Sequence, residues 1–467
     1  MTIMPSFHSN KVKRPKVSII EPRADFNGYN LLRLPLMGHL YLGTILKQRG
    51  HDVRNYSESL RPVFHPRRGI LERRIIESDV VGISIMTPTA NRGYAIADAV
   101  RKANPKARII IGGSHATALP HEALEHADMV VTGEGEGRII EAVESDDTGI
   151  IQGERVKNLD ELPVVDLKLL QGFRPGLLSL TPIATSRGCP FDCAFCSVTK
   201  MFGRQYRFRS CESVLDELER RVQAGYTKYF FYDDNYAANK GRTKSLLEGI
   251  LRRNLKIRWA CQARVDIAHD DELLDLMKRT GCITVALGVE SVNPRTLKDY
   301  NKHQSVSDIV NCIMKLKAHG IRALCMFVLG SDSDTPLTIR EMVRFLKRWK
   351  PRYAQFSVLC PLPGTRHYDE MDAAGRIWTR NWSYYDGSHV VTYPKNFTPA
   401  ELLSQVRGAW KQFYALPWVA GYAASRYLLK RWERINKKYL CHLPAVKKPE
   451  RVRETVLESV GDRRMLG

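Results

Sequence analysis

The chain has 467 residues, with 72 Lys and Arg against 50 Asp and Glu and a formal net charge of +22. This length predicts roughly two to four domains and a large buried core. No apolar run approaches the roughly 20 residues that a membrane-spanning helix needs. Residues 1–15 read as a flexible basic arm without the apolar core of a secretory signal. We therefore expect a cytoplasmic protein, and the excess positive charge favours an acidic partner or a solvated basic surface.

Residues 16–145 alternate between apolar runs and helical patterns. Strands are predicted over residues 16–22, 51–57, 79–87, 107–113 and 128–137, the last ending in a glycine-rich turn. Helices are predicted over residues 36–50, 90–103, 121–126 and 138–145. This order indicates a Rossmann-like (flavodoxin-like) open parallel sheet with helices on both faces. Ligands of such sheets bind past the C-terminal strand ends, here the loops 86–90, 112–115 and 133–137.

A second alternating region follows a linker, residues 146–180, that is rich in Asp, Leu, Pro and Gly. Its strands are predicted over residues 182–186, 228–235, 257–266, 282–291, 321–335 and 353–365. Helices are predicted over residues 211–225, 242–254, 271–281, 307–320 and 336–349. Residues 181–375 are therefore predicted to form a partial (β/α)6 TIM-type barrel with a lateral opening, and chemistry belongs at its C-terminal strand ends. A mainly helical, aromatic and basic region, residues 376–467, comes last.

Three cysteines lie at the first of these strand ends, in the C-x3-C-x2-C triplet of Cys189, Cys193 and Cys196. Thiolates this close in sequence can converge on one metal centre. Four ligands would close a zinc site, whereas three fit an iron–sulfur cluster that keeps one iron open to another molecule. Spacing alone leaves half of a zinc site as the alternative. The other seven cysteines are scattered, mostly in apolar segments typical of buried, inert thiols.

The segment C189-PFDCAFC-196 resembles the cluster loop of the radical S-adenosylmethionine (SAM) superfamily. The segments IGGSHA (111–116) and VTGEGE (131–136) resemble the cobalamin (B12)-binding domain found fused to some members, and the resemblance covers about residues 16–375. It implies a 4Fe–4S cluster on the three cysteines, SAM on the open iron, and cobalamin on the N-terminal domain. No D-x-H-x-x-G segment is present to supply a histidine to cobalt, so His115 is expected to pack or hydrogen-bond near the ligand.

The resemblance also implies positions that contact the cofactors. Those expected to bind SAM are Phe195, Asp233, Asp234, Asn235, Gln262, Arg264, Gly288, Glu290, Leu329 and Gly330. Those expected to bind cobalamin are Thr87, Pro88, Gly112, Gly113, His115, Gly133, Glu134 and Gly135. A carboxylate after the second barrel strand would accept hydrogen bonds from the SAM amine, and Glu290 would accept those of the ribose. The alternative at each position is a residue that only shapes a turn.

These features predict a cobalamin-dependent radical SAM enzyme. The resemblance implies that the reduced cluster cleaves SAM to methionine and a 5′-deoxyadenosyl radical. This radical would take a hydrogen atom from an unactivated substrate carbon, which methylcobalamin would then methylate. The first alternative is a radical SAM enzyme that cyclises, couples or rearranges its substrate without methyl transfer. The second is an RNA-binding or RNA-modifying iron–sulfur protein, although no RNA-recognition signature is present. No catalytic residue is assigned.

Two C-terminal segments mix aromatic and polar residues. Residues 378–387 would line the substrate cavity or form a surface loop packed by its own aromatic rings. Residues 409–440 fit either a helical cap on the barrel or a helix in a membrane interface, with cations toward anionic headgroups. We therefore expect a small-molecule or lipid substrate, first a lipid or isoprenoid, and peripheral contact with the inner face of the membrane through the C-terminal helix. The reductant would be a flavodoxin or ferredoxin, and we expect no nucleic-acid partner.

Overall fold

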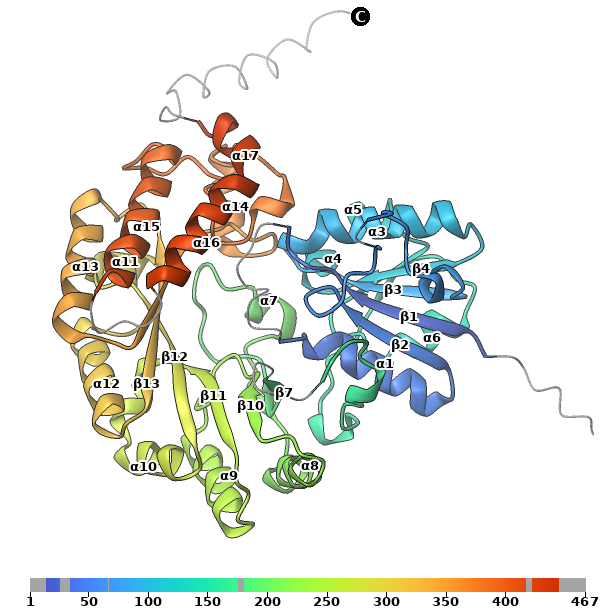
Figure 1. The fold of residues 1–467 in the computed structure, drawn as a ribbon, viewed down its shortest axis with the longest axis horizontal. Helices are drawn as coiled ribbons and strands as arrows, with labels where there is room; N and C mark the ends of the chain where they lie inside the picture. Colours follow the sequence, from blue (N-terminus) through green and yellow to red (C-terminus); the bar gives the residue numbers. More distant parts are fainter. Residues whose placement is uncertain (1–13, 26–33, 66, 175–179, 417–421, 445–467) are drawn as a thin grey trace, which may run out of the picture.

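Two parallel sheets and a C-terminal group of helices make up the protein (Figure 1). The computed structural model describes residues 14–25, 34–65, 67–174, 180–416 and 422–444. Nearly all of the predicted basic arm therefore lies outside the described residues. The N-terminal sheet, the barrel sheet and the C-terminal helices follow one another along the chain, as predicted.

The N-terminal sheet has six parallel strands in the order β2-β1-β3-β4-β5-β6. They are β1 (Lys16–Glu21), β2 (Asp52–Ser57), β3 (Val80–Ser84), β4 (Arg108–Gly112), β5 (Met129–Thr132) and β6 (Gly149–Gln152). The predicted flavodoxin-like sheet is confirmed, and its strand order reverses between β1 and β3, where such folds bind ligands. Strand β6 lies in the predicted linker. Its four residues are too short and too exposed to stand out as a strand in the sequence.

Helices cover both faces of this sheet because alternate strand residues point to opposite sides. On one face lie α1 (Met37–Arg49) and α6 (Ile139–Glu144); on the other lie α3 (Ala90–Ala103), α4 (Ser114–Ala118) and α5 (Pro120–Leu124). The cluster on the α1 face includes Val17, Ile19, Leu46, Ile110 and Ile139. The cluster on the α3 face includes Ile20, Ile83, Ile96, Ile109 and Ala116. A short helix, α2 (Arg73–Ile76), follows β2.

The barrel sheet has six parallel strands in the order β14-β13-β12-β11-β10-β7, which confirms the partial barrel. Its strands are β7 (Thr181–Ile183), β10 (Lys228–Phe231), β11 (Arg258–Ala263), β12 (Cys282–Glu290), β13 (Arg322–Leu329) and β14 (Tyr353–Val358). The helices around it are α8 (Cys211–Gln223), α9 (Lys240–Arg252), α10 (Asp271–Arg279), α11 (Pro294–Asp299), α12 (Val306–Ala318), α13 (Pro336–Trp349) and α14 (Arg366–Ala373). Capping side chains help to define where several of them begin, namely Ser210, Asn239, Asp270, Ser305 and Thr335.

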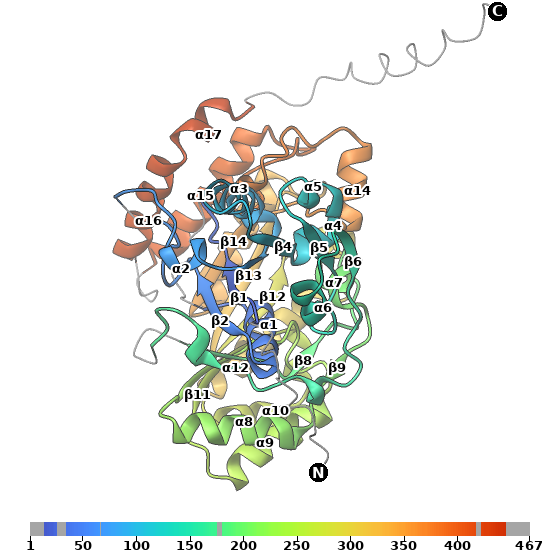
Figure 2. The same ribbon diagram turned by 90° about the vertical axis from the view of Figure 1, so that its right-hand side faces the viewer.

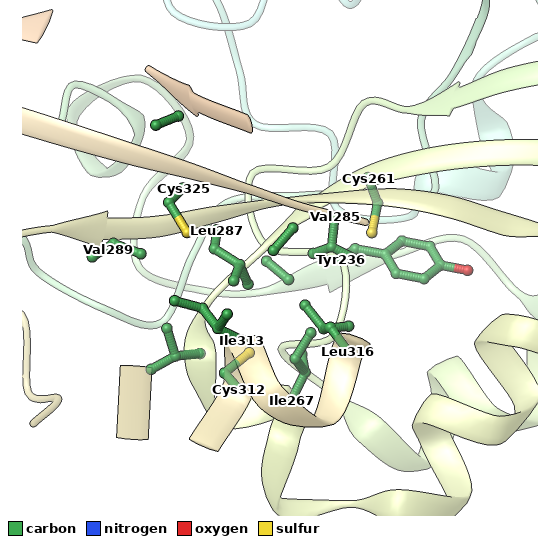
Figure 3. Close-up of a cluster of buried hydrophobic side chains, with 14 of the residues drawn as sticks. Tyr236, Cys261, Ile267, Val285, Leu287, Val289, Cys312, Ile313, Leu316 and Cys325 are labelled. Carbon is green, nitrogen blue, oxygen red and sulfur yellow. The ribbon is translucent and has the colours of Figure 1, made fainter. Parts of the chain in front are cut away.

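The barrel core is apolar and includes four of the scattered cysteines. Figure 3 shows Cys261, Cys312 and Cys325 among the leucine, isoleucine and valine side chains between the strands and α12. These three cysteines and Cys282 are buried. Burial raises the pKa of the Cys312 thiol to about 12, which keeps it protonated at neutral pH. The expectation that the scattered cysteines are buried is confirmed for these four.

The C-terminal region caps the barrel and also reaches the N-terminal domain. Helices α15 (Pro399–Tyr414), α16 (Tyr422–Ile435) and α17 (Lys437–His442) lie at the end of the molecule opposite α9 and α10 (Figure 1 and Figure 2). Helix α15 packs on α13 and β14, where the Trp410 indole donates to the Phe356 carbonyl at 3.0 Å. In the described part of the chain, no helix combines the length and the apolar character that crossing a bilayer requires.

The segment 378–387 is not a surface loop packed only by its own aromatic rings. Trp382 and Tyr385 are buried in the apolar cluster on the α3 face of the N-terminal sheet. The Trp382 indole donates to a Glu122 carboxylate oxygen at 2.8 Å. This segment therefore ties the C-terminal region to the first domain. The sequence reading missed this because the partners of Trp382 are about 260 residues away.

Candidate active site between the two sheets

The three cysteines lie on a loop that leaves the first barrel strand. A short antiparallel pair, β8 (Ser186–Arg187) with β9 (Arg207–Phe208), closes this loop, and α7 (Val198–Phe202) lies within it. Three contacts hold its middle. The Ala194 amide donates to the Tyr300 carbonyl at 3.1 Å, and the His367 amide donates to the Ala194 carbonyl at 3.2 Å. The Asn301 amide group donates to the Asp192 carbonyl at 2.8 Å.

The thiols of the loop are partly buried and unbridged. Burial raises the pKa of Cys189, and it raises that of Cys196 to about 12; nearby cysteines and Asp234 add to both shifts. Thiolates gathered here therefore need a cationic centre. Among the described residues, no three His, Cys, Asp or Glu side chains are arranged to hold a single metal ion. In an iron–sulfur cluster each thiolate binds a different iron, so the three cysteines of this loop are enough to hold a cluster.

The polar residues at the end of β10 have two different roles. Asp233 is fully buried, and its carboxylate accepts from the Thr185 amide and hydroxyl at 2.7 and 2.6 Å and from the Ser186 amide at 2.9 Å. It therefore anchors the strand that enters the cysteine loop. Burial, reinforced by Asp233, raises the pKa of Asp234 to about 7. The Asn235 amide is buried, and neither its oxygen nor its nitrogen has a partner in the described residues. Such atoms suit a ligand.

At the end of β11, Arg264 packs against the cysteine loop. Its guanidinium carbon lies 3.7 Å from the centroid of the Phe191 ring, which allows a cation–π interaction. One terminal nitrogen donates to the Lys302 and His303 carbonyls. The Nε and the other terminal nitrogen are buried without a partner in the described residues. Gln262 is half-buried, and its backbone carbonyl accepts from the Tyr236 amide at 3.0 Å.

The end of β12 holds a buried ion pair. The Lys302 ammonium donates to Glu290 at 2.8 Å, and the two side chains are 7% and 9% exposed. A Cβ on Gly288 would lie 2.7 Å from both charged groups, so a larger residue there would push the ion pair aside. Glu290 has a φ of 62°, at a bulge between β12 and β13. Sequence reasoning missed Lys302, whose only signal was the polar run from Asn301 to Gln304.

The end of β13 meets the cysteine loop through aromatic rings. The Phe195 and Tyr300 rings are 5.1 Å apart, edge to face, and the Tyr300 hydroxyl donates to the Val328 carbonyl at 3.1 Å. Leu329 is buried. Gly330 has a φ of 111°, and a Cβ there would lie 2.8 Å from Leu402 of α15. The C-terminal region therefore packs against Gly330, a predicted SAM position, which sequence reasoning had not connected with it.

A largely apolar cavity of about 310 Å³ lies between the α1 face of the N-terminal sheet and the cysteine loop. Five predicted cobalamin positions line it, namely Gly112, Gly113, Gly133, Glu134 and Gly135. Met37, Gly38 and Tyr41 of α1 also line it, although their sequence carries no ligand motif. A Cβ on Gly113 would lie 2.4 Å from the Ile85 carbonyl oxygen, and its φ is 104°.

The other three predicted cobalamin positions do not line this cavity. Thr87 and Pro88 belong to a 3-10 turn after β3. The buried His115 ring contacts the Thr87 hydroxyl at 3.2 Å and Glu122 at 3.3 Å. Burial lowers the pKa of His115, so the ring is neutral at pH 7. Both ring nitrogens therefore have protein partners, in keeping with a histidine that packs and hydrogen-bonds.

Sequence comparisons match both domains. A model of the radical SAM superfamily matches residues 183–346, and one of the B12 binding domain matches residues 32–143. The chain belongs to the radical SAM superfamily, with a B12-binding domain at its N-terminal side. The family assigns a 4Fe–4S cluster and SAM to the barrel and cobalamin to the first domain. The three thiols, the unpaired Asn235 and Arg264 atoms and the glycine-lined cavity fit these groups.

Similar proteins share most of the chain. A Pyrococcus horikoshii protein named as an uncharacterised methyltransferase is 29% identical over 82% of this chain and 88% of its own. The bacteriochlorophyllide d C-12(1)-methyltransferase of Chlorobaculum tepidum is 28% identical over 72% and 75%. The solved cobalamin-dependent radical SAM enzyme OxsB has the same fold, with a TM-score of 0.66, 16% identity and coverage of 92% of this chain and 72% of that one.

Proposed function

We propose that this radical SAM enzyme methylates an unactivated carbon of its substrate with the help of cobalamin. The observation that carries the proposal is a single cavity lined by both domains. Gly112 and Gly133 line it from the B12-binding domain, and Arg187 and Asp234 line it from the barrel beside the cysteine loop. Cofactors bound to the two domains would therefore meet at one place. When bound, they supply an electron, a 5′-deoxyadenosyl radical and a methyl group.

Names of relatives support methyl transfer. Besides the two methyltransferases above, the hopanoid C-3 methylase of Methylococcus capsulatus is 26% identical over 80% of this chain and 76% of its own. These names span a lipid and a tetrapyrrole. Both are large, mainly apolar molecules, so we propose a substrate of that kind here.

Within the proposed site, the chain positions the groups. Cys189, Cys193 and Cys196 would hold the cluster. Arg264 presents two buried nitrogen donors that have no partner among the described residues and suit a carboxylate, and Asn235 offers one donor group and one acceptor. The Phe195 ring of the loop packs edge to face against the Tyr300 ring, which helps to fix the loop.

One relative favours a second candidate, a reaction without methyl transfer. The anaerobic magnesium-protoporphyrin IX monomethyl ester cyclase of Cereibacter sphaeroides is 26% identical over 83% of this chain and 69% of its own. Its name describes ring closure. The two domains of this chain suit either reaction, so the product has to be identified to distinguish between them.

The test uses protein purified without oxygen, reconstituted with iron and sulfide, and supplied with hydroxocobalamin. We expect about four iron and one cobalt per chain. With SAM labelled by deuterium in its methyl group, an extract of the source cells should yield a product that carries the label. Iron and cobalt without label transfer would favour the second candidate. Zinc in place of iron would overturn the proposal.

We further propose that the C-terminal helices contact an anionic membrane surface, where an apolar substrate would be found. Exposed cations of α16 and α17 include Lys430, Arg431, Arg434, Lys437 and Lys438. Near them Tyr427 and Ile435 are 64% and 45% exposed. Aromatic and apolar side chains beside cations are typical of helices that lie in a membrane interface.

Sedimentation with vesicles tests this contact. The full chain should bind phosphatidylglycerol vesicles and not phosphatidylcholine vesicles, and Lys430→Glu with Arg434→Glu and Lys437→Glu should abolish binding. The matched control reverses Arg252 at the end of α9, Lys256 after it and Lys317 of α12, which are exposed as well. Equal loss of binding in both variants would mean that only net charge matters.

A further inference from the structure

The strand pair that closes the cysteine loop has an unfavourable register. Arg187 of β8 lies directly opposite Arg207 of β9. Like charges in directly opposed positions destabilise an antiparallel pair. The pair is only two residues long on each side, so its backbone bonds alone give it little stability. The closed loop therefore needs negative charge from elsewhere.

That charge comes from the other domain. Glu134 follows β5, and one oxygen of its carboxylate accepts from Arg187 at 2.8 Å and from Arg207 at 3.1 Å. Its second oxygen accepts another bond from Arg207, and Glu136 accepts one from Arg187. The side chains of all four residues are 9% exposed or less. Glu134, Glu136, Arg187 and Arg207 thus form a buried cluster of balanced charge, which we call the Glu134 latch.

The latch also borders the cavity. Glu134, Glu136 and Arg187 line it, together with glycines of the turn that holds the two glutamates. Arg187 is two residues before Cys189. A ligand that fills the cavity therefore contacts the side chains that keep the cysteine loop closed.

A latch of this kind aligns two domains more than it stabilises either. Desolvation offsets much of the attraction within a buried ion pair, yet removing one partner leaves an uncompensated charge and is strongly destabilising. Both guanidiniums also have fixed surroundings: Arg207 donates to the Val156 carbonyl at 2.5 Å, and Arg187 lies over the Tyr41 ring. The four groups thus favour one arrangement of the turn and the loop.

We propose that the Glu134 latch couples the two cofactor sites, so that a loaded cysteine loop and an occupied cavity each favour the other. This inference rests on the proposed function, since it requires both cofactors. Glu134 acts in it as a positioning residue, in addition to the cobalamin contact that the sequence indicated. Because coupling is reciprocal, it can be measured from either site.

The test measures hydroxocobalamin affinity by absorbance titration, once with the cluster reconstituted and once in the Cys189→Ala, Cys193→Ala, Cys196→Ala background. The cluster should tighten binding to the wild-type chain by about 5-fold or more, the lower end of typical coupling. Glu134→Gln should bring this ratio close to one and speed the loss of iron to a chelator. Glu141→Gln, which changes an exposed carboxylate on α6, should keep the wild-type ratio.

A second variant guards against a folding defect. Glu134→Gln combined with Arg207→Gln removes one charge of each sign, so the Glu134 latch keeps no net charge. This variant should also lose the coupling. A wild-type ratio in a folded, cluster-loaded form of either variant would overturn the latch and leave the proposed function standing. A wild-type chain that takes up no iron or no cobalt would overturn the proposed function, and the coupling with it.

Discussion

The two sheets present their C-terminal strand ends to the same site but are built differently there. On the N-terminal sheet the ends carry glycines and border an apolar cavity. On the barrel sheet they carry charged and amide side chains, such as Asp234, Asn235, Arg264 and Glu290. The N-terminal sheet can therefore bind a ligand through close approach of its backbone, whereas the barrel sheet must bind one through charges and hydrogen bonds. Small increases in side-chain volume should therefore be harmful at the N-terminal sheet, and changes of side-chain charge should be harmful at the barrel sheet.

A substitution in the cysteine loop should give the largest effect. It should abolish cofactor binding on the barrel side while cobalamin still binds on the side of the N-terminal sheet. Cys193→Ala removes one of the proposed cluster ligands, so iron content and SAM cleavage should fall to background. Hydroxocobalamin should still bind, although less tightly. Metal analysis and detection of 5′-deoxyadenosine check this, and Cys441→Ala, at an exposed position, should behave as wild type. Retained SAM cleavage by Cys193→Ala would remove the basis of the site.

The polar side should be sensitive to unpaired charge. Lys302→Met leaves the buried Glu290 carboxylate without its partner and should lower the free energy of unfolding by about 3–5 kcal/mol. Adding Glu290→Gln should recover most of this loss, because the second charge is then removed as well. Urea denaturation measures both, with Lys256→Met as an exposed control. If Lys302→Met alone is as stable as wild type, the Lys302–Glu290 pair does not stabilise the protein.

The apolar side should be sensitive to one methyl group. Gly113→Ala would place a Cβ 2.4 Å from the Ile85 carbonyl at a φ of 104°, and we expect it to cost about 2–3 kcal/mol of stability. Cobalamin affinity should fall as well, because the cavity wall must shift. Gly137→Ala is the matched control, since its Cβ would meet nothing within 4 Å. Equal stability of the two variants would contradict a closely packed wall.

The smallest effect concerns pH at the end of β1. Burial raises the pKa of Glu21 to about 7, against hydrogen bonds from Ser57 and the Leu36 amide that lower it. Its neighbour His39, at 3.7 Å, stays neutral because burial lowers its pKa to about 3. A pKa raised in the folded state means that the contribution of Glu21 to stability is complete below about pH 4.5 and is lost as pH rises through about 7.

Glu21→Gln removes this titration. The variant should therefore match wild type near pH 4 and be more stable by about 1–3 kcal/mol at pH 8. Thermal unfolding across this range measures the difference, and Glu141→Gln serves as the exposed control. A stability difference that does not change with pH would show that Glu21 is charged in the folded protein.

Local patterns carried much of the prediction. The spacing of apolar residues predicted every strand of the two sheets except β6, and helices such as α3 and α13 match their predicted bounds. The missed elements, including β6 and α11, are short, so few residues carried their pattern. The cysteine triplet was readable because its members are neighbours in the sequence, where a glycine and a proline shape one loop.

The roles of several predicted residues depended on distant partners. Asp233, expected beside SAM, holds Thr185, 48 residues earlier. Glu134, expected to bind cobalamin, pairs with Arg187 and Arg207 of the barrel. Such contacts depend on how two domains pack, which no local pattern encodes. The sequence by itself thus determined the two parallel folds and the cysteine loop, because short-range spacing encodes them. Only the tertiary structure decided which polar side chains line the cavity and which pair with one another across the two domains, because those contacts join residues far apart in the sequence.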